Sequence, residues 1–398
     1  MKPFKGFLKV IGILWVAVIF YFLGYLVGNK NLTFNENFKP QVVKTDLGKP
    51  QDVDFSMFWD AWNIVTDKFV GKINTQKMVY GAIKGMVESL GDPYTSFMEA
   101  NDSKMLQEDL SGQIQGIGAE ITEKDGKILV VAPLADSPAE RAGLKPKDEI
   151  LRIDKETTSN MSLNVAISKI RGKAGTEVNL LVNRADFQKP QEFKIKREKI
   201  IIKSVKYEMK DNIGYINITQ FGDDTTDLAK TAASEIKKQN PKAIVLDLRD
   251  NPGGYLDSAV DVASLFMKRG VVVKEQNKDG KIEELKTTLE GILSGYRIVI
   301  LANEGSASAS EIVAGALRDS RGSLIVGKRT FGKGSVQEVE NLKDGNTLKV
   351  TVARWLTPSG KAIDKEGITP DVEVDLTTED NVAGRDPQLD RALLEAGK

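Results

Sequence analysis

The sequence predicts an α+β protein of several domains, and three changes of residue pattern along the chain predict it. Apolar residues recur at three- and four-residue spacing within residues 55–111, as in amphipathic helices. Short β-rich runs fill residues 112–199. From residue 200 to 380, buried-strand patterns alternate with helical patterns, which is typical of an α/β layer with crossover connections. A chain of 398 residues is long enough for two or three such domains.

The N-terminus predicts a membrane anchor. Residues 1–9 include Lys2, Lys5 and Lys9, and residues 10–28 carry no charge. At about 1.5 Å per residue, a helix of this length approaches the roughly 30 Å hydrocarbon thickness of a bilayer. No A-x-A-like cleavage site follows, which favours an uncleaved signal anchor over the alternative, a cleaved signal peptide. The lysines predict a cytoplasmic N-terminus, so we expect a single-pass protein of the cell membrane whose later residues are extracytoplasmic.

Residues 29–54 are polar and contain Pro40 and Pro50, so we interpret them as a linker. The next segment, 55–111, has two helical stripes of apolar residues, which we expect to form a helix core. These residues are Phe58, Trp62, Val65 and Phe69, then Met78, Ala82, Met86 and Leu90. Such helices are also suited to a contact between two copies of the chain, so a homodimer is a second expectation for this segment.

Residues 112–199 are expected to form one compact β-rich unit. Ser137–Glu140 is a capping box with proline at the first helical position, and a strand pattern follows at 148–153. A turn rich in glycine stands directly before the first strand of the unit, where it is either a ligand-binding loop or a plain strand start. Its residues are Gly116, Ile117, Gly118 and Ala119.

Residues 200–380 are expected to form a largely parallel sheet, because helical patterns such as 227–238 and 256–268 separate its strands. The buried-strand candidates are 213–218, 243–248, 271–273, 298–302 and 324–326. Alternating strand patterns follow at 335–340 and 348–355, and residues 381–398 are expected to be a helical tail.

The composition restricts the chemistry, because the chain contains no histidine and no cysteine. Ser-His-Asp triads, cysteine nucleophiles and zinc sites built on imidazole or thiolate are excluded. No metal or organic cofactor is implied. Lys plus Arg equals Asp plus Glu, 56 each, and no basic stripe predicts nucleic-acid binding. Covalent chemistry would therefore need a hydroxyl nucleophile with a lysine or carboxylate base.

Ser308 and Lys333 are the candidates for such a pair. Ser308 opens an apolar helix, where the helix dipole and free N–H groups would favour a nucleophile. With Glu311 it also forms a capping box, which is the reading that the local sequence favours. Lys333 lies between two glycines, and burial there would lower its pKa toward neutrality, as a base requires. Gln337 follows at the start of a strand, from which it could hold the amine.

A third turn adds backbone donors. Residues 247–254, D-L-R-D-N-P-G-G, lead from a buried strand to a helix, so their N–H groups face the end of the sheet that Ser308 also faces. The N–H groups of Gly254 and Ala309 are suitable donors for an oxyanion hole. By itself, such a strand-to-helix turn is common.

Together these motifs resemble the carboxy-terminal processing proteases. The residues that carry the resemblance are L-R-D-N-P-G-G, G-S-A-S-A-S-E-I, K-x-x-x-Q, G-A-I-K-G-M-V-E-S-L-G-D-P-Y-T-S-F and T-P-S-G-K-A-I-D-K-E-G-I-T-P-D. Within 112–199, S-P-A-E-R-A-G-L-K-P-K-D-E-I-L-R-I-D resembles a PDZ domain. The resemblance implies a crotonase-like α/β protease core with an inserted PDZ domain and an N-terminal helical segment behind a single transmembrane helix.

The resemblance also implies residue roles in a serine endopeptidase that cleaves proteins near their C-termini. Ser308 matches the nucleophile, Lys333 its general base and Gln337 the residue that orients the lysine. Gly254 and Ala309 match the oxyanion-hole positions.

The PDZ domain of this family captures the C-terminal tail of a protein or peptide substrate, which adds as an extra strand. The residues that match its carboxylate-binding loop are Gly116, Ile117, Gly118 and Ala119. Arg171, in I-R-G-K-A-G-T, matches a position that the family can use to couple peptide binding to activation.

Rival interpretations fit the residues less well. Residues 327–334 nearly spell a nucleotide-binding P-loop, but Gly334 replaces the Mg²⁺-binding hydroxyl and a strand pattern follows instead of a helix. The alternative from another class is a catalytically silent, membrane-anchored PDZ adaptor that binds C-terminal peptides. The presence of Ser308, Lys333 and Gln337 favours the protease.

Overall fold

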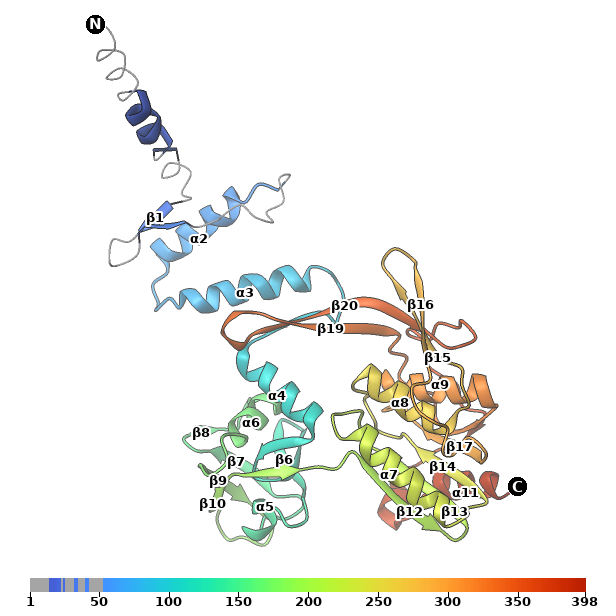
Figure 1. The fold of residues 1–398 in the computed structure, drawn as a ribbon. Helices are drawn as coiled ribbons and strands as arrows, with labels where there is room; N and C mark the ends of the chain where they lie inside the picture. Colours follow the sequence, from blue (N-terminus) through green and yellow to red (C-terminus); the bar gives the residue numbers. More distant parts are fainter. Residues whose placement is uncertain (1–13, 23, 26–31, 35–39, 43–52) are drawn as a thin grey trace, which may run out of the picture. The chain divides into compact units, whose positions relative to one another are not determined.

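The computed structural model describes residues 14–22, 24–25, 32–34, 40–42 and 53–398. The chain divides into two compact units, 1–75 and 76–398, which we treat separately (Figure 1). The described residues of the first unit are a helical stretch at 14–22 and 24–25, an antiparallel pair of strands and one further helix. The bounds are β1 (Leu32–Phe34), β2 (Pro40–Val42) and α2 (Ser56–Lys68).

The predicted anchor falls only partly on described residues. Residues 1–13, 23 and 26–28 lie outside them, as does most of the predicted linker. The helical residues 14–22 and 24–25 are exposed. Within the described ranges, no helix is long and apolar enough to span a bilayer.

The predicted helices of the N-terminal segment form, but the expectation that their apolar stripes make a helix core is wrong. None of the residues of α2 is buried, and Phe58 and Phe69 are 40% and 58% exposed. In the second unit, α3 (Thr75–Glu88) buries Val87, whereas Met86 is 63% exposed. The 3.6-residue period shows that a helix has an apolar face, but it does not specify what covers that face.

Residues 113–201 form a β-rich unit with two short helices. Its main sheet has the order β10-β9-β7-β6-β5, with β8 beside β7, so β5 is an edge strand. The hydroxyl of Ser137 accepts the N–H of Glu140 at 3.2 Å, as the predicted capping box requires. The bounds are β4 (Gln113–Gly116), β5 (Ala119–Lys124), β6 (Lys127–Pro133), α5 (Pro138–Arg141), β7 (Glu149–Ile153), β8 (Glu156–Thr157), α6 (Leu163–Ile170), β9 (Glu177–Asn183), β10 (Gln191–Lys196) and β11 (Glu198–Ile201), which pairs with β4.

The core of the second unit is a six-stranded sheet of order β12-β13-β14-β17-β18-β21. Only β12 runs antiparallel to its neighbour, so the predicted largely parallel sheet is confirmed for the strands at 213–218, 243–248, 298–302 and 324–326. The bounds are β12 (Val205–Lys210), β13 (Ile213–Ile218), β14 (Ala243–Asp247), β17 (Arg297–Ala302), β18 (Leu324–Gly327) and β21 (Val372–Glu373).

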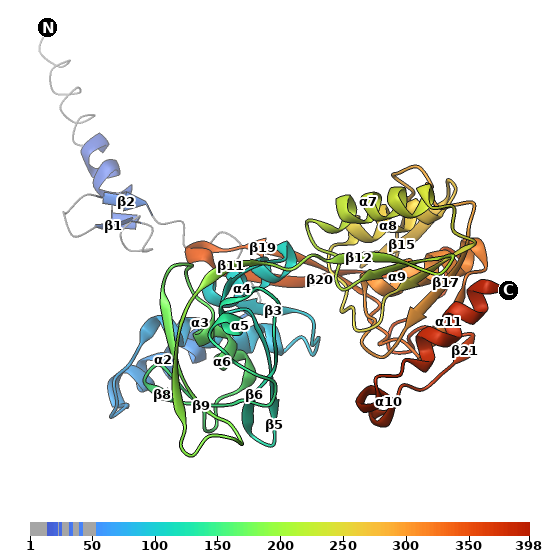
Figure 2. The same cartoon turned by 90° about the horizontal axis from the view of Figure 1, so that it is seen from below.

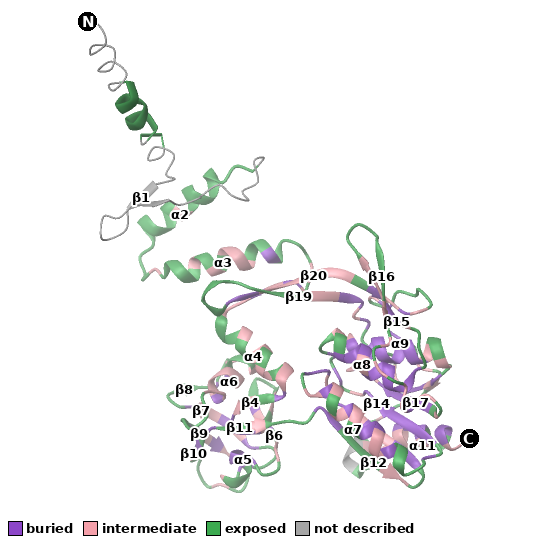
Figure 3. Cartoon of the chain, in the orientation of Figure 1, coloured by how far each residue is buried: buried purple, intermediate pink, exposed green. Residues whose placement is uncertain are grey.

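Helices cover both faces of this sheet (Figure 1, Figure 2). On one face, α7 (Thr225–Lys238), α8 (Leu256–Phe266) and α9 (Ala309–Arg321) pack against the larger apolar cluster. On the other face, α11 (Pro387–Gly397) buries Ala392 and Ala396 against the sheet. The predicted helical tail is therefore part of the core, preceded by α10 (Thr378–Ala383). Buried residues gather on the central strands and on α8 and α9 (Figure 3).

One predicted strand belongs to a different sheet. The strand predicted at 271–273 forms as β15 (Val271–Asn277), but it pairs antiparallel with β16 (Ile282–Lys286) and β20 (Thr347–Leu356). The turn between β15 and β16 contains Gly280 at φ +78°, which allows the hairpin to close locally instead of crossing to the parallel sheet. The other members of this sheet are β19 (Ser335–Asn341) and β3 (Ser96–Met98), and α4 (Ala100–Ser111) follows β3.

Candidate active site

Two turns meet where β14 and β17 end. Ser306, in the turn after β17, donates its hydroxyl to the carbonyl of Leu248 at 2.8 Å. The carbonyl of Asn251 accepts the N–H of Ala307 at 3.0 Å and the hydroxyl of Ser310 at 2.9 Å. Because adjacent parallel strands end at the same edge of a sheet, these bonds hold the predicted donor turn 247–254 directly against the serine-rich turn.

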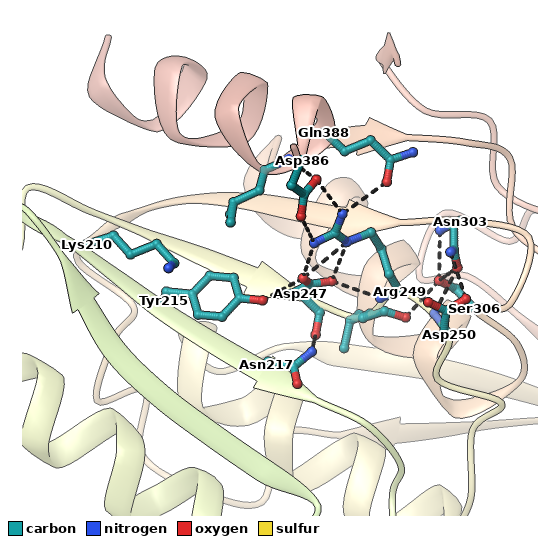
Figure 4. A network of polar contacts seen from close by, with 12 residues as sticks. Lys210, Tyr215, Asn217, Asp247, Arg249, Asp250, Asn303, Ser306, Asp386 and Gln388 are labelled. Atoms are coloured by element: carbon teal, nitrogen blue, oxygen red, sulfur yellow. Dashed lines mark hydrogen bonds and ion pairs between the residues drawn. The ribbon is translucent and has the colours of Figure 1, made fainter. Parts of the chain in front are cut away.

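A cluster of charged side chains, largely buried, contains Asp247 and Arg249 of the donor turn (Figure 4). Arg249 contacts Asp247 at 2.7 Å and Asp386, at the start of α11, at 2.9 Å. Tyr215 donates its hydroxyl to Asp247 at 2.7 Å. Burial alone would lower the pKa of Arg249, but the hydrogen bonds that its guanidinium donates to Asp247 and Asp386 raise it overall. The guanidinium therefore stays charged, and its ion pair with Asp386 connects the turn to α11.

Ser308 has a backbone conformation that serine adopts rarely. It precedes α9 with φ 54° and ψ −113°. Non-glycine residues with positive φ are uncommon, and strained residues of this kind gather at functional sites. The predicted contact with Glu311 is present, since the N–H of Ser308 donates to the Glu311 carboxylate at 2.9 Å. The cap and the nucleophile are therefore compatible roles for one turn.

The double glycine of the donor turn lies against Ser308. Gly253 has φ +104°, and a Cβ there would stand 2.8 Å from the Cβ of Ser308. Gly254 has φ +143°, and a Cβ there would stand 2.1 Å from the carbonyl oxygen of Phe221. Within the described part of the chain, the N–H groups of Gly254 and Ala309 donate to no protein acceptor. Both predicted oxyanion donors are thus available to a substrate oxygen.

Lys333 is held in place through its backbone, and its amine lies near an aromatic ring and three charged groups. The buried indole of Trp355 donates to the carbonyl of Lys333 at 2.8 Å. The Lys333 ammonium lies 5.1 Å from the ring centroid of Tyr94. Burial, followed by the charge of Lys349, lowers the pKa of Lys333, although Asp92 and Glu311 act in the opposite direction.

Among the described residues no carboxylate lies within ion-pair distance of Lys333, so the net effect of its surroundings is to favour the neutral amine.

Glu311 connects the nucleophile turn to the lysine turn. One carboxylate oxygen accepts the N–H groups of Ser308 and Lys333, both at 2.9 Å. The other accepts the hydroxyl of Thr330 at 2.5 Å and the N–H of Gly332 at 2.8 Å. Burial raises the pKa of Glu311, but all four donors favour the ionised form.

The predicted catalytic residues line one cavity of about 370 Å³. Its lining includes Ser308, Lys333, Gln337, Gly254 and Ala309. The structure brings these five residues together, but among the described contacts no hydrogen bond joins Ser308 Oγ to Lys333 Nζ. The Gln337 amide does not reach Lys333 either. It donates to the hydroxyls of Ser335 at 2.8 Å and Thr351 at 3.3 Å.

The walls of this cavity are mainly apolar. Leu106 and Leu110 come from α4, and Ile312, Val336 and Trp355 come from α9, β19 and β20. Such walls favour apolar side chains next to the bond that Ser308 would attack.

A second cavity, of about 350 Å³, lies in the β-rich unit. All four residues of the predicted binding loop line it, beside the edge strand β5 and the helix α6. A free strand edge next to an apolar groove is the arrangement in which an extended peptide adds as a further strand. Arg171 also lines this cavity.

An ion pair with α4 connects Arg171 to the cavity that contains Ser308. The Arg171 guanidinium contacts Asp109 at 2.7 Å, and Asp109 lines the cavity that contains Ser308. The Nη1 atom of Arg171 is buried and has no hydrogen-bond partner within the described residues. A single ion pair therefore joins a residue that lines one cavity to a residue that lines the other.

The sequence does not reveal the roles of Glu311, Asp92 and Tyr94. The position of Glu311 predicts a helix cap, and no local pattern predicts its bonds to the lysine turn 22 residues later. Asp92 and Tyr94 stand in G-D-P-Y-T-S-F, which predicts the end of a helix and contributes to the family resemblance but indicates no contact with Lys333. Across the described residues, no group of three or more acidic residues is arranged to hold a metal ion.

Comparison with known proteins agrees with this geometry. Family profiles match peptidase family S41 over residues 212–374, a PDZ domain over 129–184 and the N-terminal domain of the activating protease CtpB over 16–102. The chain is 41% identical to carboxy-terminal processing protease CtpA of Bacillus subtilis (strain 168), over 82% of this chain and 70% of that one. It is 42% identical to a "Probable CtpA-like serine protease" of Staphylococcus haemolyticus (strain JCSC1435), over 79% of this chain and 63% of that one.

Among solved structures, the photosystem II D1 C-terminal processing protease superposes with a TM-score of 0.53 at 32% identity. The match covers 80% of this chain and 86% of that one. Together with the cavity that unites Ser308 and Lys333, these likenesses establish that the chain belongs to peptidase family S41, as a C-terminal processing serine protease with a PDZ domain.

Proposed function

We propose that Ser308 and Lys333 form the catalytic dyad of this peptidase and cleave protein substrates near their C-termini. The observation that supports this best is their shared cavity, with Lys333 partly buried and its pKa lowered. A neutral lysine accepts the proton of the Ser308 hydroxyl as the oxygen attacks the peptide carbonyl. Rotation of the Lys333 side chain within the cavity brings the amine to hydrogen-bond distance.

The intermediate then carries a negative oxygen, which the free N–H groups of Gly254 and Ala309 stabilise. Lys333 returns its proton to the leaving amine, and the acyl group stays on Ser308. Water, deprotonated by Lys333, releases the product and restores the serine. Gln337 lies at the cavity wall, where its amide orients the amine once Lys333 turns toward Ser308.

The PDZ cavity selects the substrate in this proposal. The backbone of Gly116–Ala119 binds the terminal carboxylate, and the tail pairs with the edge strand β5, which adds one strand to the sheet. The ion pair between Arg171 and Asp109 couples occupancy of this cavity to the catalytic cavity.

The test uses the full chain in detergent and an unfolded substrate with an apolar C-terminus, followed by intact mass. Wild type should cleave, and Ser308→Ala and Lys333→Ala should each lose cleavage while keeping their melting temperatures. Retained turnover in either variant contradicts the dyad. Binding without cleavage by wild type would leave a PDZ adaptor as the better description.

We also propose that α2 joins two copies of the chain. Trp59 and Val65 are 56% and 44% exposed, and Phe58 packs edge-on against Trp59. A helix with exposed aromatic and aliphatic side chains and no buried residue is suited to burial against a second copy. Sedimentation should give a dimer for wild type and a monomer for Trp59→Asp, whereas the exposed polar change Asp60→Asn should leave the dimer intact.

Residues 10–28 are proposed to anchor the protein in the cell membrane with the protease outside the cytoplasm. The support is the uncharged run behind three lysines. Membrane fractionation and protease accessibility of intact cells test both claims. Full protection of the catalytic part in intact cells would contradict the orientation.

A further inference from the structure

The loop that leads from α3 to β3 reaches the catalytic lysine. The ring of Tyr94 lies with its centroid 5.1 Å from Lys333 Nζ, within the range of a cation–π contact. Its phenol does not add a charge, because burial, together with nearby carboxylates, raises the pKa of Tyr94 above its usual range. An aromatic face therefore meets the amine that would act as base.

Other charged groups face Lys333 from several elements. Lys349 on β20 opposes its protonation, whereas Asp92 in the loop and Glu311 on α9 favour it. Among the described residues neither carboxylate forms an ion pair with the ammonium, and both accept hydrogen bonds from other donors. The Tyr94 ring is thus a neutral partner in direct contact with the amine.

The same loop is anchored to the residues around Gln337. One carboxylate oxygen of Asp92 accepts the hydroxyls of Thr351 and Thr95, both at 2.6 Å. The hydroxyl of Thr351 in turn accepts the amide of Gln337 at 3.3 Å. Hydrogen bonds from Thr351 and Thr95 outweigh the effect of burial and lower the pKa of Asp92. The carboxylate is therefore ionised and holds Thr351 in one orientation.

We propose that the loop Asp92–Thr95 completes the catalytic base. The Tyr94 ring stabilises the Lys333 ammonium that forms when Lys333 takes the Ser308 proton, and Asp92 is a positioning residue that acts through Thr351 on Gln337. The inference rests on the proposed roles of Ser308 and Lys333.

The physical advantage lies in the difference between the two states of the lysine. A ring face attracts an ammonium but gains little from a neutral amine. It therefore stabilises the transition state more than the resting base, which is the condition for faster catalysis. A carboxylate paired to Lys333 would hold the resting lysine protonated, and the base would be lost at neutral pH.

The test compares Tyr94→Phe with Tyr94→Leu in the full chain, through the pH profile of kcat/KM for cleavage. Tyr94→Phe keeps the ring, so its change from the wild-type profile should be smaller than that of Tyr94→Leu. Tyr94→Leu removes the ring, so its plateau at high pH should fall roughly 3- to 30-fold, and its ascending limb should shift to lower pH. At low pH the lower plateau is offset by the larger fraction of neutral Lys333, so kcat/KM of the two variants should converge there. The values should separate as pH rises.

A purely structural role predicts something different, namely an equal loss at every pH. That result, or an unchanged Tyr94→Leu profile, would overturn the role of the ring. If Tyr94→Leu does not fold, Tyr94→Met provides the non-aromatic comparison. Wild type without cleavage at any pH would instead refute the proposed dyad.

A second pair of variants tests the link to Gln337. Thr351→Val keeps the shape of the side chain but removes the hydroxyl between Asp92 and Gln337, whereas Thr351→Ser keeps the hydroxyl. Thr351→Val should lower kcat about 10-fold with KM unchanged, as expected for one lost positioning hydrogen bond. Thr351→Ser should restore most of the rate. Equal kcat in wild type and Thr351→Val would refute the positioning role of Asp92.

Discussion

The carboxylate of Glu311 accepts the backbone N–H of Lys333 at 2.9 Å, with the same oxygen that accepts the N–H of Ser308. The turn that carries the proposed nucleophile and the turn that carries its base are therefore joined by one buried side chain. The separation of the two turns is therefore set by hydrogen bonds from their backbones to Glu311.

Glu311→Gln should impair both stability and activity. A glutamine offers one acceptor oxygen and turns an amide N–H₂ toward two of the four donors, which leaves buried N–H groups unpaired. We expect the free energy of unfolding to fall by about 2–4 kcal/mol, since each such group costs roughly 1–3 kcal/mol. Cleavage should fall at temperatures where the variant is still folded. Denaturant unfolding measures the first effect, and Glu304→Gln, at an exposed position near the same turn, is the control. A wild-type melting temperature for Glu311→Gln would contradict the bridging role.

The pH profile of cleavage should depend on Lys349. Lys333 must be neutral to act as base, so activity should rise with pH through a lysine pKa that burial and Lys349 hold below its ordinary value. Lys349→Gln removes a positive charge, so the pKa of Lys333 should rise and the ascending limb should move to higher pH. Initial rates between pH 6 and 10 measure this shift. Lys343→Gln, an exposed lysine of the same hairpin, should leave the limb in place. A shift to lower pH would show that another group limits the rate.

Arg249→Met should destabilise the core strongly. The change leaves the buried carboxylate of Asp247 without its cation and detaches Asp386 at the start of α11. Removing one partner of a buried pair typically costs about 3–5 kcal/mol, which chemical denaturation can measure. Arg385→Met is the matched control, because Arg385 is 61% exposed in its pair with Asp380 and should cost at most about 1 kcal/mol. Similar losses for the two variants would argue against the buried cluster.

Asp109→Asn and Arg171→Ala should separate regulation from stability. Asp109 is half exposed, so the ion pair itself should contribute at most about 1 kcal/mol. If it couples the two cavities, kcat/KM for a substrate with a C-terminal tail should change more than kcat/KM for a short peptide without one. Arg141→Ala, which breaks the exposed pair with Glu198, should affect neither substrate. Equal changes for both substrates in the two coupling variants would speak against communication through this pair.

Local patterns predicted the elements of this protein well. The strand at 213–218 and the helix caps at Ser137 and Ser308 formed where the residues indicated. Non-local relationships were less accessible. The strand at 271–273 formed in a separate antiparallel sheet, because pairing depends on a hairpin turn and not on the apolar content of the strand.

By itself, the sequence determined the chemistry that is available to this protein. A chain without histidine or cysteine has few routes to covalent catalysis, and short motifs with fixed spacing located Ser308, Lys333 and the glycine turn. Only the tertiary structure decided how the turns meet, that Glu311 joins them, and that Tyr94 lies against the amine. The physical reason is that helix caps, turns and amphipathic patterns are set by residues close together along the chain. Contacts between residues hundreds of positions apart depend on how the packed layers close around them.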